Sequence, residues 1–191
     1  MNILVLGPQG AGKGTQGKLI AEGYGIPHVA TGDMLRSAIA AGTELGKQVK
    51  PIYDAGNLVP DDLMIELIRE RLAEEDAREG FVLDGFPRTI PQAEALDEML
   101  REIGHELDVV LELQLDDSVG RARMLKRAAE EGRADDTPEA IDQRLRLYHE
   151  QTAPLIEHYR TRGDLVGIHA DRTIDAVFAE IQQALEQVAV R

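Results

Sequence analysis

The sequence predicts an α/β fold, a doubly wound parallel sheet of about five strands flanked by helices, in one domain with small inserts. The first observation is a set of short runs rich in Val, Ile and Leu, each of strand length and bounded by turn residues. The second is that amphipathic segments of helical length separate these runs, an alternation typical of a parallel sheet covered on both faces. The third is the length of 191 residues, which suits one domain that buries a core without disulfides.

The predicted elements follow one another along the chain in that alternating order. The strand-like runs cover residues 3–6, 81–83, 109–115 and 165–168. A helix is expected after the glycine-rich segment that follows the first run, and further helices are expected over 61–75, 91–103, 117–129, 138–160 and 173–188. Thr137 before Pro138 is typical of a helix N-cap and first position, and Pro60 before Asp61 similarly opens a helix with acid in its first turn.

Two stretches, 30–58 and 127–136, fit the alternating pattern poorly and are predicted to be insertions. In open parallel sheets, ligands bind in the crevice outside the carboxyl ends of the strands. Insertions that lie over those ends are therefore candidate covers for a ligand site.

The composition excludes several classes of protein. With 35 acidic and 21 basic residues the formal net charge is −14, which argues against nucleic acid as a partner because such binding depends on accumulated Lys and Arg. The absence of Cys excludes disulfides and thiolate zinc sites, and no two of the five His stand at metal-ligand spacing, so no zinc is expected. No apolar run reaches about 18 residues and no basic region opens the chain, so we expect a cytoplasmic protein with no membrane partner.

The first predicted strand runs directly into a glycine-rich loop at residues 7–15, GPQGAGKGT. Between a strand and a helix, such a loop turns backbone N–H groups around a phosphate, while the helix presents its positive end. Lys13 adds a positive charge, and Gly14 followed by Thr15 stands where Ser or Thr usually comes directly after the Lys. The loop therefore predicts a nucleotide phosphate site, and a glycine-rich turn without ligand is the alternative.

Two further motifs place polar groups near the carboxyl ends of the strands. In ATGDMLR at 30–36, Thr31 is predicted to cap a helix, and Arg36 to lie one turn in, where it either points into the same cleft or is solvated. In DGFPR at 84–88, Asp84 directly follows an apolar strand, and its carboxylate suits a Mg²⁺ held through water. A surface Asp-Gly turn is the alternative interpretation of the second motif.

A set of arginines gathers in the second half of the chain, at Arg121, Arg123, Arg127, Arg133 and Arg144. Singly, such residues are usually solvated and paired with acids, here Asp135 and Asp136. Beside a phosphate loop, arginines on a flexible segment are also suited to clamp a phosphoryl group during its transfer. No nucleophile-elbow serine motif occurs, so covalent catalysis has no candidate residue.

Taken in order, the glycine-rich loop, TGDMLR, DGFPR and the GRADDT segment at 132–137 closely resemble the adenylate kinase family, in its bacterial short-lid form, over essentially the whole chain. The resemblance implies a P-loop nucleoside monophosphate kinase fold with a core of residues 1–29, 60–120 and 137–191. It also implies an AMP-binding insert at 30–59 and a short lid at 121–136. The longer lid of many relatives, with its frequent metal-binding Cys, is missing between Arg127 and Arg133.

The resemblance implies a role for each site residue. ATP would contact Gly10, Ala11, Gly12, Lys13, Gly14, Thr15, Arg123, Arg127 and Arg172. AMP would contact Thr31, Arg36, Asn57, Leu58, Val59, Gly85, Phe86, Pro87, Arg88, Gln92, Arg133 and Arg144. The catalytic residues among them would be Lys13, Arg88, Arg123, Arg133 and Arg144. Asp84, with Asp33 behind it, would organise the water shell of Mg²⁺, and Asp135 and Asp136 would close the lid.

These roles imply a monomeric kinase that transfers phosphate from ATP to AMP and gives two ADP. The acceptor phosphate is already ionised at neutral pH, so the reaction requires no general base. The nearest alternative is a UMP or CMP kinase, although such relatives usually carry Ala where Thr31 stands. A non-catalytic nucleotide switch is the alternative from another class, but it has no need of Arg36, Arg88 and Gln92 as a second phosphate site.

The two sets of arginines also predict motion of the two inserts. Like charges held close in a desolvated cleft repel, so the acceptor-side and donor-side arginines are expected to stay apart until nucleotides lie between them. We therefore expect an open form without ligand, in which both inserts are mobile and close over bound nucleotides.

Overall fold

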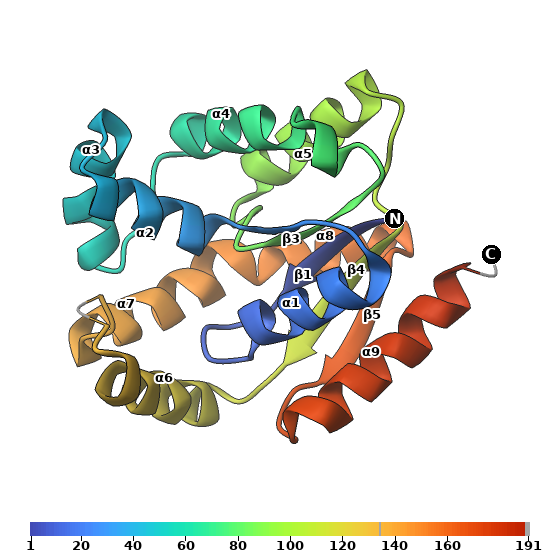
Figure 1. Ribbon diagram of the computed structural model, residues 1–191. Coiled ribbons are helices and arrows are strands. Elements are labelled where there is room, and N and C mark those ends of the chain that lie inside the picture. Colours follow the sequence, from blue (N-terminus) through green and yellow to red (C-terminus); the bar gives the residue numbers. More distant parts are fainter. Residues whose placement is uncertain (134, 190–191) are drawn as a thin grey trace.

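Five parallel strands form one sheet with the order β2-β3-β1-β4-β5 in the computed structural model, which describes residues 1–133 and 135–189 (Figure 1). The strands are β1 (Asn2–Leu6), β2 (His28–Ala30), β3 (Phe81–Asp84), β4 (Val109–Gln114) and β5 (Leu165–His169). The doubly wound parallel sheet is thereby confirmed, and all four predicted runs are strands. The register sets Val5 opposite both Asp84 and Leu111, so the central strands end side by side.

Strand β2 completes the five-stranded sheet, and sequence analysis did not predict it. It is only three residues long and has two buried apolar side chains, Val29 and Ala30, which is too short for a recognisable apolar run. Ala30 pairs with Asp84 of β3, so it belongs to the sheet rather than to the predicted insertion at 30–58. The insertion consists instead of two helices that begin at Thr31.

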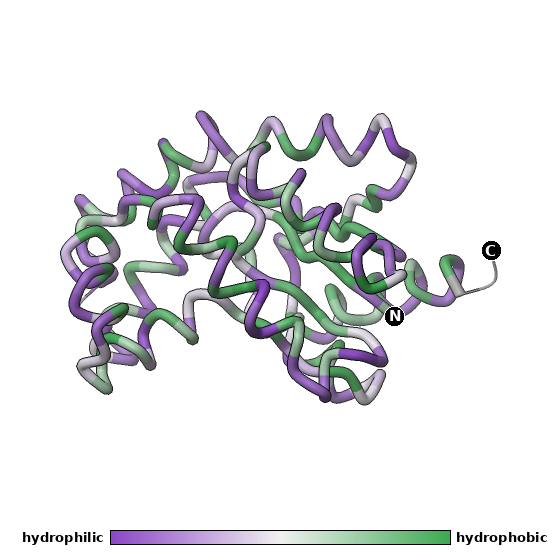
Figure 2. The backbone as a smooth tube through the Cα atoms, turned by 90° about the horizontal axis from the view of Figure 1, so that it is seen from above, coloured by the Kyte–Doolittle hydropathy of each residue, from purple (hydrophilic) through white to green (hydrophobic). Residues whose placement is uncertain are grey.

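Helices cover both faces of the sheet. Ile3 and Val5 point into a core shared with α1 and α9, whereas Leu4 and Leu6 point into a second core shared with α4, α5 and α8. The helical elements are α1 (Lys13–Tyr24), α2 (Thr31–Ala41), α3 (Glu44–Asp54), α4 (Asp61–Leu72), a 3₁₀ turn η1 (Glu75–Ala77), α5 (Ile90–Glu102), α6 (Asp117–Glu131), α7 (Pro138–Leu147), a π-helical turn η2 (Tyr148–Thr152), α8 (Pro154–Arg162) and α9 (Ile174–Ala189). Figure 2 shows hydrophobic residues along the strands in the middle of the molecule, with hydrophilic residues spread over the surrounding helices.

The helix expected over 138–160 is interrupted. Thr137 caps its start as predicted, because its side chain accepts a hydrogen bond from the Ala140 N–H. Pro154 has no N–H to continue the helical ladder, and a wider π turn precedes it, closed by a 2.7 Å hydrogen bond from Ala153 N–H to the Tyr148 carbonyl. The turn directs Thr152 inward, and its hydroxyl donates to the Arg88 carbonyl at 2.9 Å.

Two other local predictions are wrong. Residues 127–131, assigned to an insertion, continue α6, which ends only where Gly132 adopts a left-handed φ of 64°. Thr31 is not an N-cap: Ala30 holds that position, and the Thr31 hydroxyl donates instead to the Asp84 carbonyl at 3.3 Å. The Thr31 side chain therefore bonds to the neighbouring strand β3 and does not cap its own helix.

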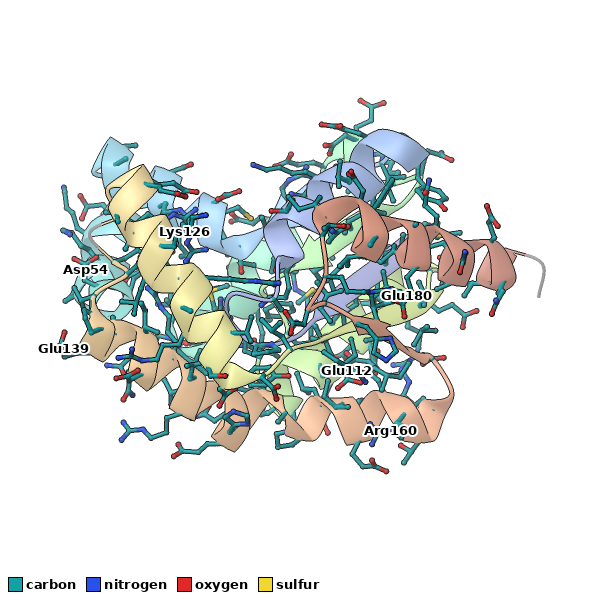
Figure 3. All side chains as sticks on the ribbon, turned by 90° about the horizontal axis from the view of Figure 1, so that it is seen from below. Asp54, Glu112, Lys126, Glu139, Arg160 and Glu180 are labelled. Carbon is teal, nitrogen blue, oxygen red and sulfur yellow. The ribbon has the colours of Figure 1, made fainter. Side chains whose placement is uncertain are left out.

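The elements leave the two inserts on the same side of the molecule. Figure 3 shows Asp54 at the end of α3, Lys126 in α6 and Glu139 at the start of α7 at one end of the fold, and the hydrogen bond from Arg144 of α7 to the Tyr53 carbonyl of α3 agrees with this. Ala134, within the predicted lid, and Val190 and Arg191, within the predicted core, lie outside the described residues. None of the helices in the described ranges is both long and apolar enough to cross a membrane.

Candidate active site

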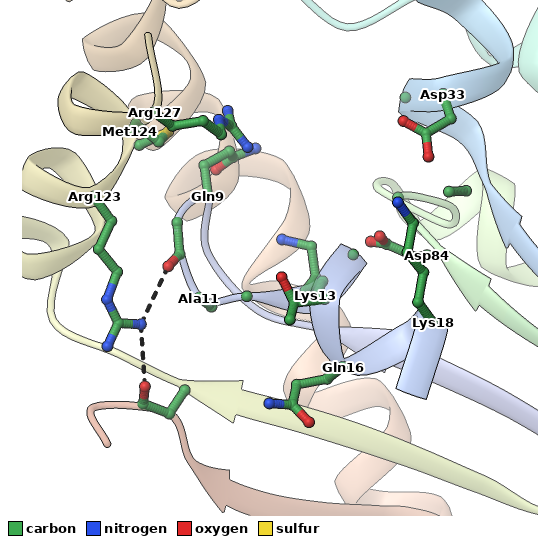
Figure 4. A pocket seen from close by; sticks show the side chains of 18 of the residues that line it. Gln9, Ala11, Lys13, Gln16, Lys18, Asp33, Asp84, Arg123, Met124 and Arg127 are labelled. Carbon is green, nitrogen blue, oxygen red and sulfur yellow. Dashed lines mark hydrogen bonds between the residues drawn. The ribbon is translucent and has the colours of Figure 1, made fainter. Parts of the chain in front are cut away.

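A cavity of about 840 Å³ lies at the carboxyl ends of the central strands (Figure 4). It is lined by the glycine-rich loop, the start of α2, the end of β3 and side chains of α6 and α7. The cavity therefore lies at the edge where sequence analysis expected a ligand. Among the predicted residues, it brings together Gly10, Ala11, Gly12, Lys13, Gly14, Thr15, Asp33, Arg36, Asn57, Asp84, Gly85, Arg88, Arg123, Arg127, Arg133, Arg144 and Arg172.

The glycine-rich loop depends on left-handed backbone. Gly10 and Gly12 have φ values of 83° and 91°, which side chains rarely adopt. A Cβ at Gly10 would also meet backbone atoms of Gly120 at 2.4–2.8 Å, so the loop packs directly on the start of α6. The N-terminus of α1 follows at Lys13, which gives the loop the positive helix end that an anion site needs.

Lys13 crosses back over this loop. Its Nζ donates to the carbonyls of Gly7 at 2.8 Å and Pro8 at 3.0 Å. Burial lowers the pKa of Lys13 to about 8, while the Asp84 carboxylate raises it and the guanidiniums of Arg88 and Arg127 lower it further. The ammonium is therefore held in a place that already disfavours its charge, which an incoming phosphate would relieve.

Proton uptake on nucleotide binding should report this environment. The resemblance implies that a triphosphate binds beside Lys13, where it would restore the charge of the ammonium. At pH 9, binding of Mg-ATP should then take up roughly one proton per site, whereas at pH 7 uptake should nearly vanish because the ammonium is mostly charged in both states. The measurement is titration calorimetry in buffers of different ionisation enthalpy. Lys13→Met should abolish the uptake at pH 9, and equal uptake in that variant would contradict the assignment.

Asp84 ends β3 beside the loop. Its Oδ2 lies 3.8 Å from His28 Nε2 and 3.7 Å from the position that a Cβ of Gly14 would occupy, so the glycine after Lys13 keeps the space between loop and carboxylate narrow but open. Asp33, predicted to support Asp84, instead pairs with Arg36. No group of three or more His, Asp or Glu in the described ranges is arranged to hold a metal ion. A single carboxylate fits a Mg²⁺ that keeps its waters.

Two predicted arginines meet on one buried carboxylate. Asp136, with a fully buried side chain, accepts hydrogen bonds from Arg127 at 2.6 and 2.8 Å and from Arg144 at 2.7 Å. Arg144 also lies 3.2 Å from Asp135. Asp136 neutralises the two guanidiniums between which it lies, so Arg127 and Arg144 are held together without ligand. That the acceptor-side and donor-side arginines stay apart until nucleotides bind stays a prediction.

The remaining arginines have separate partners. Arg123 donates to the carbonyls of Gly10 at 3.3 Å and Ala170 at 3.1 Å, and so ties the loop to the segment after β5 (Figure 4). Arg133 pairs with Glu131 at 2.7 Å and Arg172 with Glu180, and both arginines line the cavity. Arg121 turns away from the cavity and pairs with Asp142.

Arg88 carries a positive charge near the cavity without a carboxylate partner. Its Nε donates to the Gly85 carbonyl at 2.8 Å, and no carboxylate of the described residues lies within 4.0 Å of its guanidinium. Burial lowers its pKa, Asp84 and Tyr53 raise it, and Arg144 lowers it again. Arginine stays charged in proteins, so this site holds a cation that an anionic ligand would stabilise.

Several predicted acceptor residues lie behind the cavity rather than in it. They are Thr31, Leu58, Val59, Phe86, Pro87 and Gln92. Gln92 is 2% exposed; its Oε1 accepts from Arg88 N–H and its Nε2 donates to Asp61, both at 2.7 Å. Gly85 has a φ of 85° and lets the Thr31 hydroxyl approach to where a Cβ would lie. Gln92 and Thr31 therefore hold the loop at 85–88 after β3, the Arg88 loop, in this conformation.

Sequence reasoning missed Tyr53, Asp61 and Thr152. Tyr53 lines the cavity from α3, and its hydroxyl accepts a 2.6 Å hydrogen bond from Arg36. Asp61 and Thr152 bind the Arg88 loop through Gln92 and the Arg88 carbonyl. None of the three stands in a motif, and no spacing along the chain signals contacts between separate elements.

Known proteins match this chain over nearly its full length. The family model for adenylate kinase matches residues 5–164. An adenylate kinase of Stenotrophomonas maltophilia (strain R551-3) is 47% identical over 186 residues, which cover 97% of this chain and 100% of the relative. Those of Caulobacter vibrioides (strain NA1000 / CB15N) and Leifsonia xyli subsp. xyli (strain CTCB07) are 49% and 51% identical; the first match covers 99% of each chain, and the second covers 97% of this chain and 93% of the relative.

Proposed function

This chain belongs to the adenylate kinase family, and from that premise we propose that it catalyses the reversible, Mg²⁺-dependent reaction of ATP and AMP to give two ADP. Membership makes it a nucleoside monophosphate kinase that transfers phosphoryl groups among adenine nucleotides. The nucleotide pair, the residues and the mechanism below are the proposal. We also propose that the chain is active as a monomer.

The observation that carries the proposal is one cavity lined by two sets of cationic groups. The first set is the glycine-rich loop with Lys13, and the second set is Arg36 and Arg88. Arg127 and Arg144, which both bind Asp136, line the same cavity from α6 and α7. A nucleotide switch needs only the first set, so the second set favours transfer between two phosphate-bearing ligands over binding of one.

On the donor side, the loop from Gly10 to Thr15 and Lys13 would hold the ATP phosphates. Arg123 and Arg172 lie where the loop meets the segment after β5 and would flank the donor nucleotide. Arg127 would either turn from Asp136 toward the transferring phosphoryl group or stabilise the charge of that group from its present position. A positive charge that is fixed and desolvated stabilises the developing charge of the transfer more strongly than one in water.

On the acceptor side, Arg36 and Arg88 would grip the AMP phosphate, with Asn57 and Gly85 beside its nucleoside. The reacting phosphate oxygen is already ionised, so the transfer requires no general base and depends on alignment of the two anionic nucleotides. Arg133 and Arg144 would cover the transferring group and exclude water, which otherwise competes as acceptor.

Asp84 would hold Mg²⁺ through its waters beside the loop, since it is the carboxylate closest to Gly14. When bound with ATP, the ion would neutralise phosphate charge during the transfer. Asp33 would contribute indirectly, by holding Arg36.

The inserts at 30–59 and 121–136 would act as covers over the cavity. In this structure the first insert contacts α7 of the core: Asn57 Oδ1 accepts from Gln143 at 2.9 Å, and a Cβ at Gly56 would meet the Ala140 carbonyl at 2.5 Å. Ligand would then close the covers further by drawing Arg36, Arg88 and Arg133 onto phosphate, while Asp136 keeps Arg127 and Arg144 assembled.

Acceptor preference tests the function. In a coupled assay with Mg-ATP and equal concentrations of AMP, CMP, UMP or GMP, we expect kcat/KM for AMP to exceed the others by roughly 10²-fold, because buried groups shaped for one base are left unpaired by another. A higher kcat/KM for UMP or CMP would reassign the acceptor. Tight ATP binding with no transfer to any of the four would overturn the kinase proposal.

A further inference from the structure

Tyr53 is a neutral side chain that lies among the guanidiniums of Arg36, Arg88 and Arg144. It belongs to α3, whereas Arg36 comes from α2, Arg88 from the loop after β3 and Arg144 from α7. Three elements that are separate in sequence therefore present guanidiniums around one neutral side chain, which itself lines the cavity.

Four contacts hold Tyr53 in place. Arg36 Nη1 donates to its hydroxyl oxygen at 2.6 Å. The Arg144 guanidinium lies over its ring, 5.3 Å from the centroid, and Arg144 Nη2 donates to its carbonyl at 3.3 Å. The ring packs on the core that covers this face of the sheet. The side chain is thus fixed at ring, hydroxyl and backbone.

The hydroxyl has one hydrogen, and Arg36 does not use it. A tyrosine hydroxyl both donates and accepts, and here its oxygen is occupied as an acceptor by the guanidinium. Among the described residues, no acceptor lies within hydrogen-bond distance to receive the remaining proton. An acceptor bound in the cavity beside Arg36 and Arg88 would therefore meet a donor whose direction is already set.

We propose that the Tyr53 hydroxyl donates a hydrogen bond to the phosphate of the acceptor nucleotide, in the site where Arg36 and Arg88 bind it, and that it holds Arg36 in position to do so. This rests on the proposed function for the identity of the acceptor. A phosphate dianion is the ligand that matches two guanidiniums and a neutral donor, because it offers several acceptor lone pairs in a small volume. The neutral ring also separates Arg36 from Arg144, which lowers their mutual repulsion before ligand arrives.

The test compares Tyr53→Phe, which removes only the hydroxyl and keeps the ring over Arg144, with the unmodified enzyme. Calorimetric titration with AMP should show Kd raised about tenfold, the loss expected for one hydrogen bond to a charged group, and KM for AMP should rise in parallel. Kd and KM for ATP should stay within twofold. Adenosine, which lacks the phosphate, should inhibit both enzymes with the same constant.

A matched control is Tyr24→Phe, the same change at an exposed tyrosine at the end of α1, which should leave every constant unchanged. A second variant, Tyr53→Leu, also removes the ring and should raise Kd for AMP further. Thermal melting of all three variants identifies any general loss of structure.

Two results would overturn the inference: an AMP affinity of Tyr53→Phe within twofold of the unmodified enzyme, or equal losses for AMP, adenosine and ATP, which indicate a structural role alone. Calorimetric titration measures binding without turnover, so it tests the inference even if the acceptor assay shows no transfer. Conversely, an unmodified enzyme that phosphorylates none of the four nucleotides overturns the proposed function and leaves the titrations interpretable.

Discussion

Replacing Lys13 by Met is expected to lower kcat by about 10²–10³-fold while the protein stays folded. The change keeps most of the apolar stem and removes only the ammonium, which the structure holds over the loop by hydrogen bonds to the Gly7 and Pro8 carbonyls. Transfer loses a desolvated positive charge next to the phosphates. Stability loses little, because burial already opposes that charge and lowers the pKa of Lys13 to about 8.

A coupled assay at saturating Mg-ATP and AMP measures the change in kcat, and circular dichroism with thermal melting checks the fold. Lys126→Ala is the matched control, since Lys126 is an exposed lysine on α6 whose partner Glu130 lies 3.7 Å away. It should keep full activity. A folded Lys13→Met enzyme with near-normal kcat would refute the assignment of the loop.

Replacing Asp136 by Asn is expected to destabilise the protein by about 3 kcal/mol, as for other buried ion pairs that lose one partner. For a domain of this size, that corresponds to a melting temperature lower by roughly 10 °C. The amide keeps one acceptor oxygen but turns N–H groups toward two guanidiniums, Arg127 and Arg144, that share the carboxylate. Both charges are then left poorly compensated in a place largely removed from water.

The matched control is Asp142→Asn, because Asp142 pairs with Arg121 in a similar way at the surface. Water screens that pair, so the melting temperature should be nearly unchanged. A tethered ATP–AMP analogue should restore part of the stability lost in Asp136→Asn, since its phosphates replace the missing negative charge between the arginines. Equal melting temperatures for Asp136→Asn and the unmodified protein would show that Asp136 does not hold the arginines together.

Local patterns of apolar residues in the sequence predicted most of the fold. The strands at 3–6, 81–83, 109–115 and 165–168 were predictable because each is a run of apolar residues whose neighbours are turns, and a buried parallel strand leaves that record in its own residues. The short strand β2 left no such record, since its stability comes from pairing with β3 rather than from its composition. The sequence shows Pro154 but does not predict the π turn before it. That turn depends on backbone geometry and on the hydrogen bond from the Thr152 hydroxyl to the Arg88 carbonyl.

The sequence by itself determined four of the five strands, the glycine-rich loop and the residue types that surround it, because a strand, a glycine turn and a helix start are each decided by residues within a few positions. Only the tertiary structure decided which charges face one another. Arg127 and Arg144 share Asp136, Arg36 meets Tyr53, and Gln92 turns to Asp61 rather than into the cavity. These partners lie on elements whose relative placement depends on how helices pack on two faces of one sheet, and a periodic pattern reports only which face of a helix is buried, not which side chain of another element it will meet.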